Sequence, residues 1–137
     1  MKEIVINNQF GCFGLSYKGV MHYTSLKGFK VYAYKQNYNP HVLIEVSEKD
    51  AKSSLFIEYY KTPQVSGSKH NNDDYFSDHD ILRNDPDLIQ TIKDIGSKKA
   101  SGQCSTLKII EIPDDTNWVI EEYDGNEWIA EKHQTWS

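Results

Sequence analysis

A glycine-containing loop at residues 7–17 restricts most strongly how this chain can fold, because it joins a short apolar strand to a segment with helical character. Gly11 and Gly14 alternate in it with the aromatic residues Phe10 and Phe13. Glycine tolerates positive φ angles and lets backbone N–H groups approach a ligand closely. A loop of this kind before a helix N-terminus favours an anion-binding site. A tight turn packed by two aromatic rings accounts for the same residues.

The loop matches no common nucleotide-binding fingerprint. It lacks the Gly-Lys-Ser/Thr ending of a Walker A loop, and its Gly-x-x-Gly is shorter than the Gly-x-Gly-x-x-Gly of dinucleotide-binding domains. Ser16 is suited to cap a helix over residues 16–26, in which Val20, Tyr23 and Leu26 repeat at spacings of three. Gly28 is placed to end that helix.

A second helix is expected at residues 85–95. Asp85 is a favourable N-cap and Pro86 a favourable first helical residue. One apolar face then follows, made by Leu88, Ile89, Ile92 and Ile95.

Apolar and β-branched runs predict strands at residues 2–6, 29–34, 42–46, 55–60, 107–112, 118–123 and 127–133. Asp124 and Gly125 form a hairpin turn signal between the last two. We therefore expect a single α+β domain over residues 1–137, with a mostly antiparallel mixed sheet of about six strands and two helices on one face. Residues 47–53 fit a hairpin or a short helix, and the polar residues 62–74 predict a mobile surface loop.

Composition excludes some classes of function. The 137 residues carry a formal net charge of −5, which argues against a partner that is a nucleic acid polymer. No apolar run reaches membrane-spanning length, so we expect no membrane association. Cys12 and Cys104 are the two cysteines, far apart in sequence, which favours a reducing, cytoplasmic setting. Each is either a small buried hydrophobe or a reactive thiol.

Several charged residues have both a structural and a functional interpretation. Arg83 either pairs with a nearby aspartate (Asp78, Asp80 or Asp85) or faces a phosphate or a base of a ligand. Lys98 and Lys99 form a small basic, flexible turn that is either solvated or in contact with an anion.

Catalytic and metal sites have weaker support. Glu131 and His133, two apart on a strand, form either an acid–base pair or a surface salt bridge. Residues 78–80 read Asp-His-Asp, but consecutive residues do not converge easily on one cation. We expect no metal, no cofactor and no catalytic residue.

Several motifs together resemble a large family of small phage and viral proteins, identified most closely with the viral anti-CBASS sponges. CBASS is a bacterial defence that signals with cyclic oligonucleotides. The resemblance rests on IVIN and FGCFGLS at the start, DILRNDPDL in the second helix region, and LKI, EIPDD, W, EEYDG and EKHQTW near the end. About half of the chain is covered, and residues 31–75 match no pattern of the family. Gly11-Cys12 departs from the Gly-Gly usual there.

The resemblance implies a protein that binds cyclic nucleotides such as cyclic GMP–AMP without cleaving them. It also implies a homo-oligomer, a tetramer, in the cytoplasm of an infected bacterium. The alternatives are a small enzyme that acts on a nucleotide, with Glu131 and His133 as acid and base, and a non-catalytic protein-interaction module.

The expected ligand-binding residues combine the glycine loop, the first helix turn and nearby cations and aromatic rings. They are Phe10, Gly11, Phe13, Gly14, Ser16, Tyr17, Arg83, Lys98, Lys99 and His133.

Overall fold

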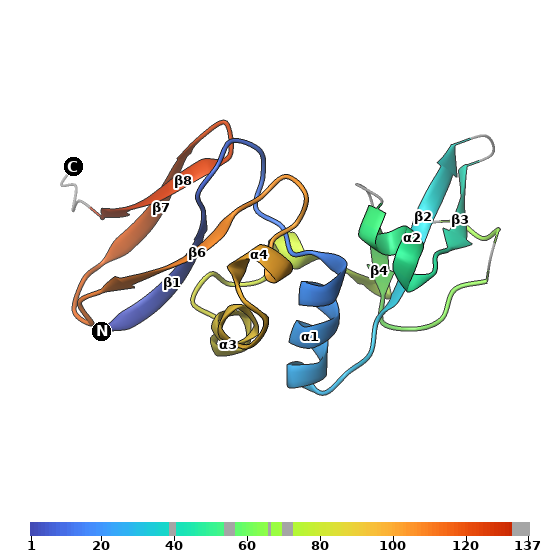
Figure 1. The fold of residues 1–137 in the computed structure, drawn as a ribbon, viewed down its shortest axis with the longest axis horizontal. Coiled ribbons are helices and arrows are strands. Elements are labelled where there is room, and N and C mark those ends of the chain that lie inside the picture. The colour runs from blue at the N-terminus through green and yellow to red at the C-terminus, as the bar shows by residue number, and fades with distance from the viewer. Residues whose placement is uncertain (39–40, 54–56, 66, 70–72, 133–137) are drawn as a thin grey trace.

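The computed structural model describes residues 1–38, 41–53, 57–65, 67–69 and 73–132, which form one α+β body (Figure 1). The strands are β1 (Lys2–Asn7), β2 (Tyr32–Tyr38), β3 (His41–Glu45), β4 (Glu58–Tyr60), β5 (Tyr75–Phe76), β6 (Leu107–Ile112), β7 (Trp118–Tyr123) and β8 (Asn126–Glu131). The helices are α1 (Tyr17–Lys27), α2 (Glu48–Ser53), a 3₁₀ turn η1 (Asp78–Asp80), α3 (Pro86–Ile95) and α4 (Ser97–Ala100).

The strands pair only in antiparallel fashion, within the described residues, and form three small sheets. These sheets are β1-β6, β3-β2-β4-β5 and β7-β8. The predicted α+β class is therefore confirmed. The expected single sheet is replaced by three, because α1, α3 and α4 lie between β1-β6 and the sheet that contains β2 (Figure 1).

The β7-β8 hairpin turns at the predicted dipeptide. Asp124 has φ 49° and Gly125 has φ 83°, so both turn residues adopt the positive φ angles of the tightest hairpin class. Gly125 must be glycine for a second reason, since a Cβ there would lie 1.6 Å from the carbonyl oxygen of Gly11.

Helix α1 begins and ends as its sequence predicts. The Ser16 Oγ accepts a hydrogen bond from the Gly19 N–H at 3.0 Å, and Gly28 closes the helix with φ 91°. The predicted apolar face is partly wrong. Val20 and Tyr23 are buried, but Leu26 is 40% exposed, and Thr24 takes the buried position instead.

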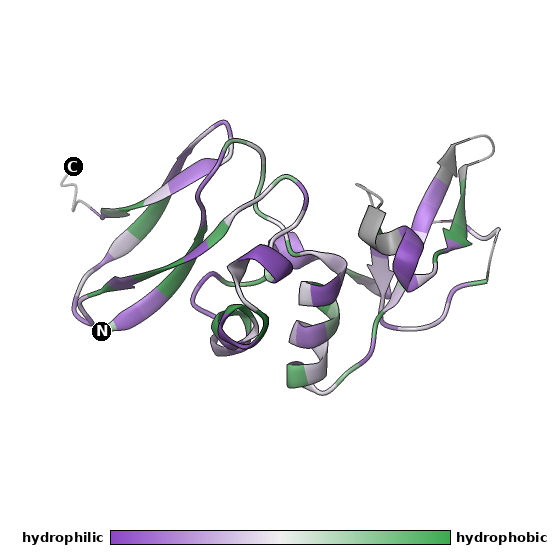
Figure 2. Cartoon of the chain, in the orientation of Figure 1, coloured by the Kyte–Doolittle hydropathy of each residue, from purple (hydrophilic) through white to green (hydrophobic). Residues whose placement is uncertain are grey.

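Helix α3 follows the prediction closely. Asp85 is the N-cap and accepts from the Asp87 N–H at 2.8 Å, while Pro86 is the first helical residue. Leu88 and Ile92 are buried, and the helix divides into a hydrophobic and a hydrophilic side more sharply than α1 does (Figure 2).

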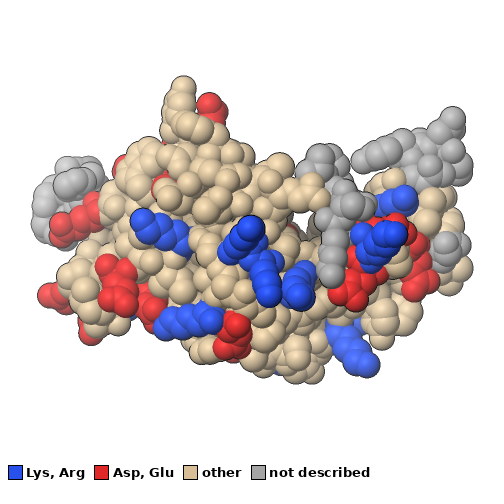
Figure 3. Space-filling view, viewed as in Figure 1, with Lys and Arg blue, Asp and Glu red and all other residues tan. Residues whose placement is uncertain are grey.

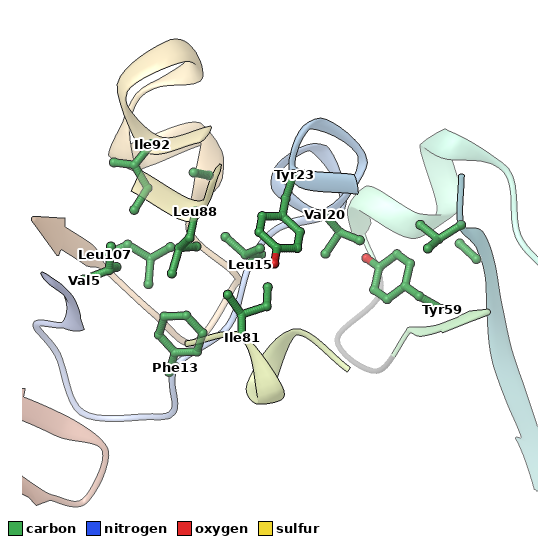
Figure 4. Packing of buried hydrophobic residues seen from close by; sticks show 13 residues of the cluster. Val5, Phe13, Leu15, Val20, Tyr23, Tyr59, Ile81, Leu88, Ile92 and Leu107 are labelled. Atoms are coloured by element: carbon green, nitrogen blue, oxygen red, sulfur yellow. The ribbon is translucent and has the colours of Figure 1, made fainter. Parts of the chain in front are cut away.

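One hydrophobic core connects the helices to two of the sheets. Leu88, Ile92, Val5 and Leu107 gather under α3, and Leu15, Tyr23 and Ile81 continue the core toward α1 (Figure 4). Val20 and Tyr59 extend it to the sheet that contains β4. A smaller cluster of Tyr34, Leu43 and Tyr60 stabilises that sheet from within.

Three local expectations are decided or corrected here. Residues 47–53 are mostly helix α2 rather than a hairpin. Lys98 and Lys99 lie in the short helix α4 and not in a flexible turn, because the Ala100 and Ser101 N–H groups close helical hydrogen bonds. The expected strand at 29–34 begins later, at Tyr32, as β2.

The polar loop at residues 62–74 contains no helix or strand in its described part. Leu43 nevertheless pairs with it, since the Leu43 N–H donates to Ser68 O at 2.6 Å and the Gly67 N–H donates to Leu43 O at 2.7 Å. The mobility of this loop stays a prediction. None of the described helices is long and apolar enough to cross a membrane.

The N-cap of α3 provides the first test. The Asp85 carboxylate accepts hydrogen bonds from the Tyr23 hydroxyl at 2.8 Å and from Asp87 N, and lies 3.1 Å from the Lys27 ammonium. Partial burial raises the pKa of Asp85, but these three partners outweigh it and hold that pKa below its ordinary value. We predict that Asp85→Ala lowers the free energy of unfolding at pH 7 by about 1–2 kcal/mol.

The prediction is tested by the pH dependence of the difference in unfolding free energy between the wild type and Asp85→Ala. Because the folded pKa is depressed, the stabilisation is complete above the ordinary carboxyl pKa of about 4 and is lost as the pH falls through the folded value. Urea unfolding of both proteins at pH 7 and pH 2.5 measures it. A difference that stays the same at both pH values contradicts the assignment.

Candidate functional site

A large cavity opens beside the glycine loop, with a volume of about 1020 Å³. One wall comes from residues 12–18, together with α4 and residues 101–105. The other comes from β2 and β4 with Tyr75, while η1 lies next to the glycine loop, where Asp78 accepts from the Leu15 N–H. This volume is just above the range of about 300–1,000 Å³ usual for small-molecule sites. A smaller cavity of about 570 Å³ lies beside the C-terminal end of α1, with Lys30 in its lining.

The large cavity is rich in cations, although the protein as a whole is acidic. Four lysines line it, namely Lys18, Lys35, Lys98 and Lys99, against the two carboxylates of Glu58 and Asp78. Lys and Arg side chains gather over α4 and the start of α1 (Figure 3). Within the described part of the chain, none of these four lysines forms an ion pair, whereas Lys27 and Lys93 each pair with carboxylates. The cavity therefore offers positive charge to an anionic ligand.

Aromatic rings supply the apolar part of the lining, with contributions from Phe13, Tyr17, Tyr59 and Tyr75. Burial raises the pKa of the Tyr59 phenol above its ordinary value, and the nearby Asp78 adds to the effect. Burial and Glu58 raise the pKa of Tyr75 in the same direction. Both phenols are protonated at neutral pH, as an unperturbed tyrosine is, and the raised pKa extends this to more alkaline pH.

The glycine loop donates most of its N–H groups to the protein itself. The Gly11 N–H donates to Asp124 O, the Cys12 N–H to Cys104 O and the Ser16 N–H to Ala100 O. The Leu15 N–H donates to the Asp78 carboxylate at 2.7 Å. An internal carboxylate thus occupies the position that we expected for a ligand phosphate, so the lysines rather than the loop amides carry the charge of this site.

Arg83 serves as a structural brace rather than as a lining residue of the cavity. Its guanidinium donates to both carboxylate oxygens of Glu127, at 2.5 and 2.9 Å, and stacks on the Phe13 ring at 3.6 Å. The pairing with Asp78, Asp80 or Asp85 considered from the sequence is wrong, because Glu127 of β8 takes the guanidinium. The Phe13 ring lies between this ion pair and the cavity, which it lines.

The remaining sequence candidates divide clearly. Phe13, Gly14, Ser16, Tyr17, Lys98 and Lys99 all line the cavity. Phe10 and Gly11 do not: Phe10 packs edge-on against Tyr123, and Gly11 contacts the hairpin turn. His133 lies outside the described residues, and Glu131 ends β8 away from the cavity lining.

The two cysteines overturn the expectation of buried hydrophobes. Cys12 and Cys104 are both exposed free thiols, and both line the cavity. Partial burial raises the pKa of the Cys12 thiol, with Cys104 and Asp78 adding to the shift. Residues near a turn stay exposed when no helix or strand covers them, and the apolar character of the side chain does not reveal this.

Sequence reasoning missed several residues that organise the site. Asn7 is fully buried, and its N–H donates a hydrogen bond to the Glu127 carboxylate. Its side-chain amide donates to Gln9 O and Gly125 O and accepts from the Thr106 N–H. An asparagine directly after an apolar strand was the available signal. Lys35, Glu58 and Tyr59 come from the region of the chain that carried no motif.

Comparison with known proteins gives no identification: no family model, no curated protein and no solved structure matches this chain. A proposal of function therefore depends on the cavity and on the sequence motifs of the chain itself.

The Arg83–Glu127 ion pair yields a prediction about stability. Glu127 is 7% exposed, so Arg83→Ala leaves a buried carboxylate without its cation. We expect the free energy of unfolding to fall by about 3 kcal/mol. Chemical denaturation measures it.

A matched control is Lys93→Ala, which removes a more exposed ion pair with Glu3 and should cost less than about 1 kcal/mol. Equal losses in the two variants, or a neutral Arg83→Ala, would show that the ion pair does not brace the fold.

Proposed function

We propose that this protein binds a small anionic nucleotide in the large cavity and sequesters it without chemical change. The observation that carries the proposal is the juxtaposition of four lysines, which form no ion pair with the described residues, and four aromatic rings around a cavity of about 1020 Å³. Lysine ammonium groups suit phosphates, and flat rings suit bases. A single inorganic phosphate would leave most of such a volume empty.

The ligand class that we propose is a cyclic dinucleotide such as cyclic GMP–AMP. The sequence resemblance to viral anti-CBASS sponges supports this choice, and so do the cavity's volume and its distribution of charge. The protein would then act for a phage in the cytoplasm of its host, removing the signal of the bacterial defence. Sequestration requires tight binding and no turnover. We accordingly assign no catalytic residue.

The two walls have different tasks in this proposal. Lys98 and Lys99 of α4, with Lys18 of α1, lie on the wall that carries the glycine loop and would contact phosphates. Tyr59 and Tyr75 lie on the opposite wall with Glu58 and Gln36, where polar side chains would contact the base edges. A ligand that spans both walls gains contacts from both and excludes water between them.

The exposed surface supports the proposed homo-oligomer, a tetramer. Phe10 and Tyr123 are each 67% exposed and pack edge-on at 6.4 Å. Trp128 is exposed on the same hairpin. Exposed aromatic residues close together are typical of interfaces between subunits.

The binding prediction uses isothermal titration calorimetry with cyclic GMP–AMP. Replacing both lysines of α4, in Lys98→Ala/Lys99→Ala, should weaken binding at least tenfold, or about 1.4 kcal/mol, because two ammonium–phosphate contacts are removed. The matched control is Lys108→Ala on β6, an exposed lysine outside the cavity, whose affinity should equal that of the wild type.

The same titration separates binding from turnover. After denaturation of the complex, the ligand should be recovered intact by chromatography. No binding by the folded wild-type protein, or equal affinity in all three proteins, contradicts the site. Recovery of a cleaved nucleotide contradicts sequestration.

The assembly prediction is tested by light scattering. We expect a particle of four chains of 15.8 kDa, and smaller particles for Phe10→Ser/Tyr123→Ser, since this change makes the exposed pair polar. A wild-type particle of 15.8 kDa at micromolar concentration would rule the tetramer out.

A further inference from the structure

Two segments far apart in the sequence run antiparallel along one wall of the cavity. Leu15 and Ser101 form a β-bridge, and the Gly102 N–H donates to Gly14 O at 2.9 Å. The antiparallel pairing ends at Gly102, because the Ser105 N–H donates back to Gly102 O at 3.2 Å and closes a turn. Within that turn the Cys104 carbonyl accepts from the Cys12 N–H at 3.3 Å, and this backbone hydrogen bond places the two cysteines next to each other.

Residues joined by a backbone N–H···O bond are close enough for a disulfide, which spans Cα atoms about 4.4–6.8 Å apart. Both thiols are free and exposed, and both line the same cavity. Position and access therefore agree.

We propose that Cys12 and Cys104 form a dithiol site that reacts with low-molecular-weight disulfides, such as glutathione disulfide, and closes to an internal disulfide. One protein thiolate attacks a sulfur of glutathione disulfide, forming a mixed disulfide and releasing one glutathione. The second protein thiolate then attacks the protein sulfur of that mixed disulfide and releases the second glutathione. The protein loses two electrons and two protons, and glutathione disulfide is reduced to two thiols.

Closure has a structural consequence that does not depend on the proposed ligand. The disulfide joins the glycine loop to the segment before β6 and encloses most of the chain in one ring. A long enclosed segment restricts the unfolded chain strongly. The oxidised protein should therefore melt at a higher temperature, and the wall of the cavity should be covalently fixed.

The test uses the full-length protein, incubated with glutathione disulfide and then with iodoacetamide, and examined by intact mass. The wild type should lose two hydrogens, carry no glutathione and take up no alkyl group. Its thermal midpoint should rise by roughly 5–10 °C and return on reduction. Cys12→Ser and Cys104→Ser have one thiol each, so each should keep one glutathione and show no such rise.

Other outcomes overturn the proposal. Two glutathiones on the wild type show that the thiols react separately, two alkyl groups show that neither reacts, and a covalent dimer shows pairing between chains. The wild-type masses decide the matter even if a serine variant fails to fold. Circular dichroism of the variants confirms that a missing rise in their melting temperature is not caused by unfolding.

Discussion

The rest of the structure depends on one buried polar junction, in which Asn7 and Arg83 both hold the carboxylate of Glu127. Glu127 Oε1 accepts from the Asn7 N–H at 2.7 Å and from the Arg83 guanidinium at 2.5 Å. The Asn7 side chain meanwhile donates to Gly125 O and accepts from the Thr106 N–H. A two-stranded hairpin such as β7-β8 has little stability alone. This junction is what holds it to β1, and its groups are satisfied by each other, as burial of polar atoms requires.

The junction also determines the shape of the cavity on its far side. Arg83 stacks on the Phe13 ring, which lines the cavity, so the position of that ring depends on a residue that does not line it. Asp78 then fixes the next part of the loop through the Leu15 N–H. The glycine loop therefore both lines the cavity and makes structural contacts with Arg83 and Asp78. This explains why its sequence fitted a ligand-binding loop and a packed turn equally well.

Features that depend on neighbouring residues were predicted correctly from the sequence. Features that depend on contacts between distant residues were not. Ser16, Asp85, Pro86 and the Asp124-Gly125 turn act within a few residues of themselves, so the sequence alone predicted both main helices and the last hairpin. The arrangement in three sheets, the Glu127 partner of Arg83 and the neighbouring cysteines depend on long-range packing, which no local pattern encodes. Among the proposed site residues, the loop positions reached the cavity because they adjoin the predicted start of α1. Lys98 and Lys99 reached it because the long-range hydrogen bonds of Ser16 to Lys99 O and Ala100 O hold α4 against that start. Lys35, Glu58 and Tyr59 reached it from an unrelated part of the chain.

The close contact between Gly11 and Gly125 restricts how this protein can diversify. A Cβ at either position would collide with backbone, at Cys104 O or at Gly11 O, and side-chain rearrangement cannot relieve such a collision. The loop wall of the cavity is thus built from backbone contacts that substitution cannot adjust gradually. The opposite wall is made of side chains on β2 and β4, where Lys35 is exposed and Gln36 and Glu58 are half-buried. Relatives of this fold with altered ligand preference should therefore differ along β2 and β4, while the glycine contact is inherited unchanged.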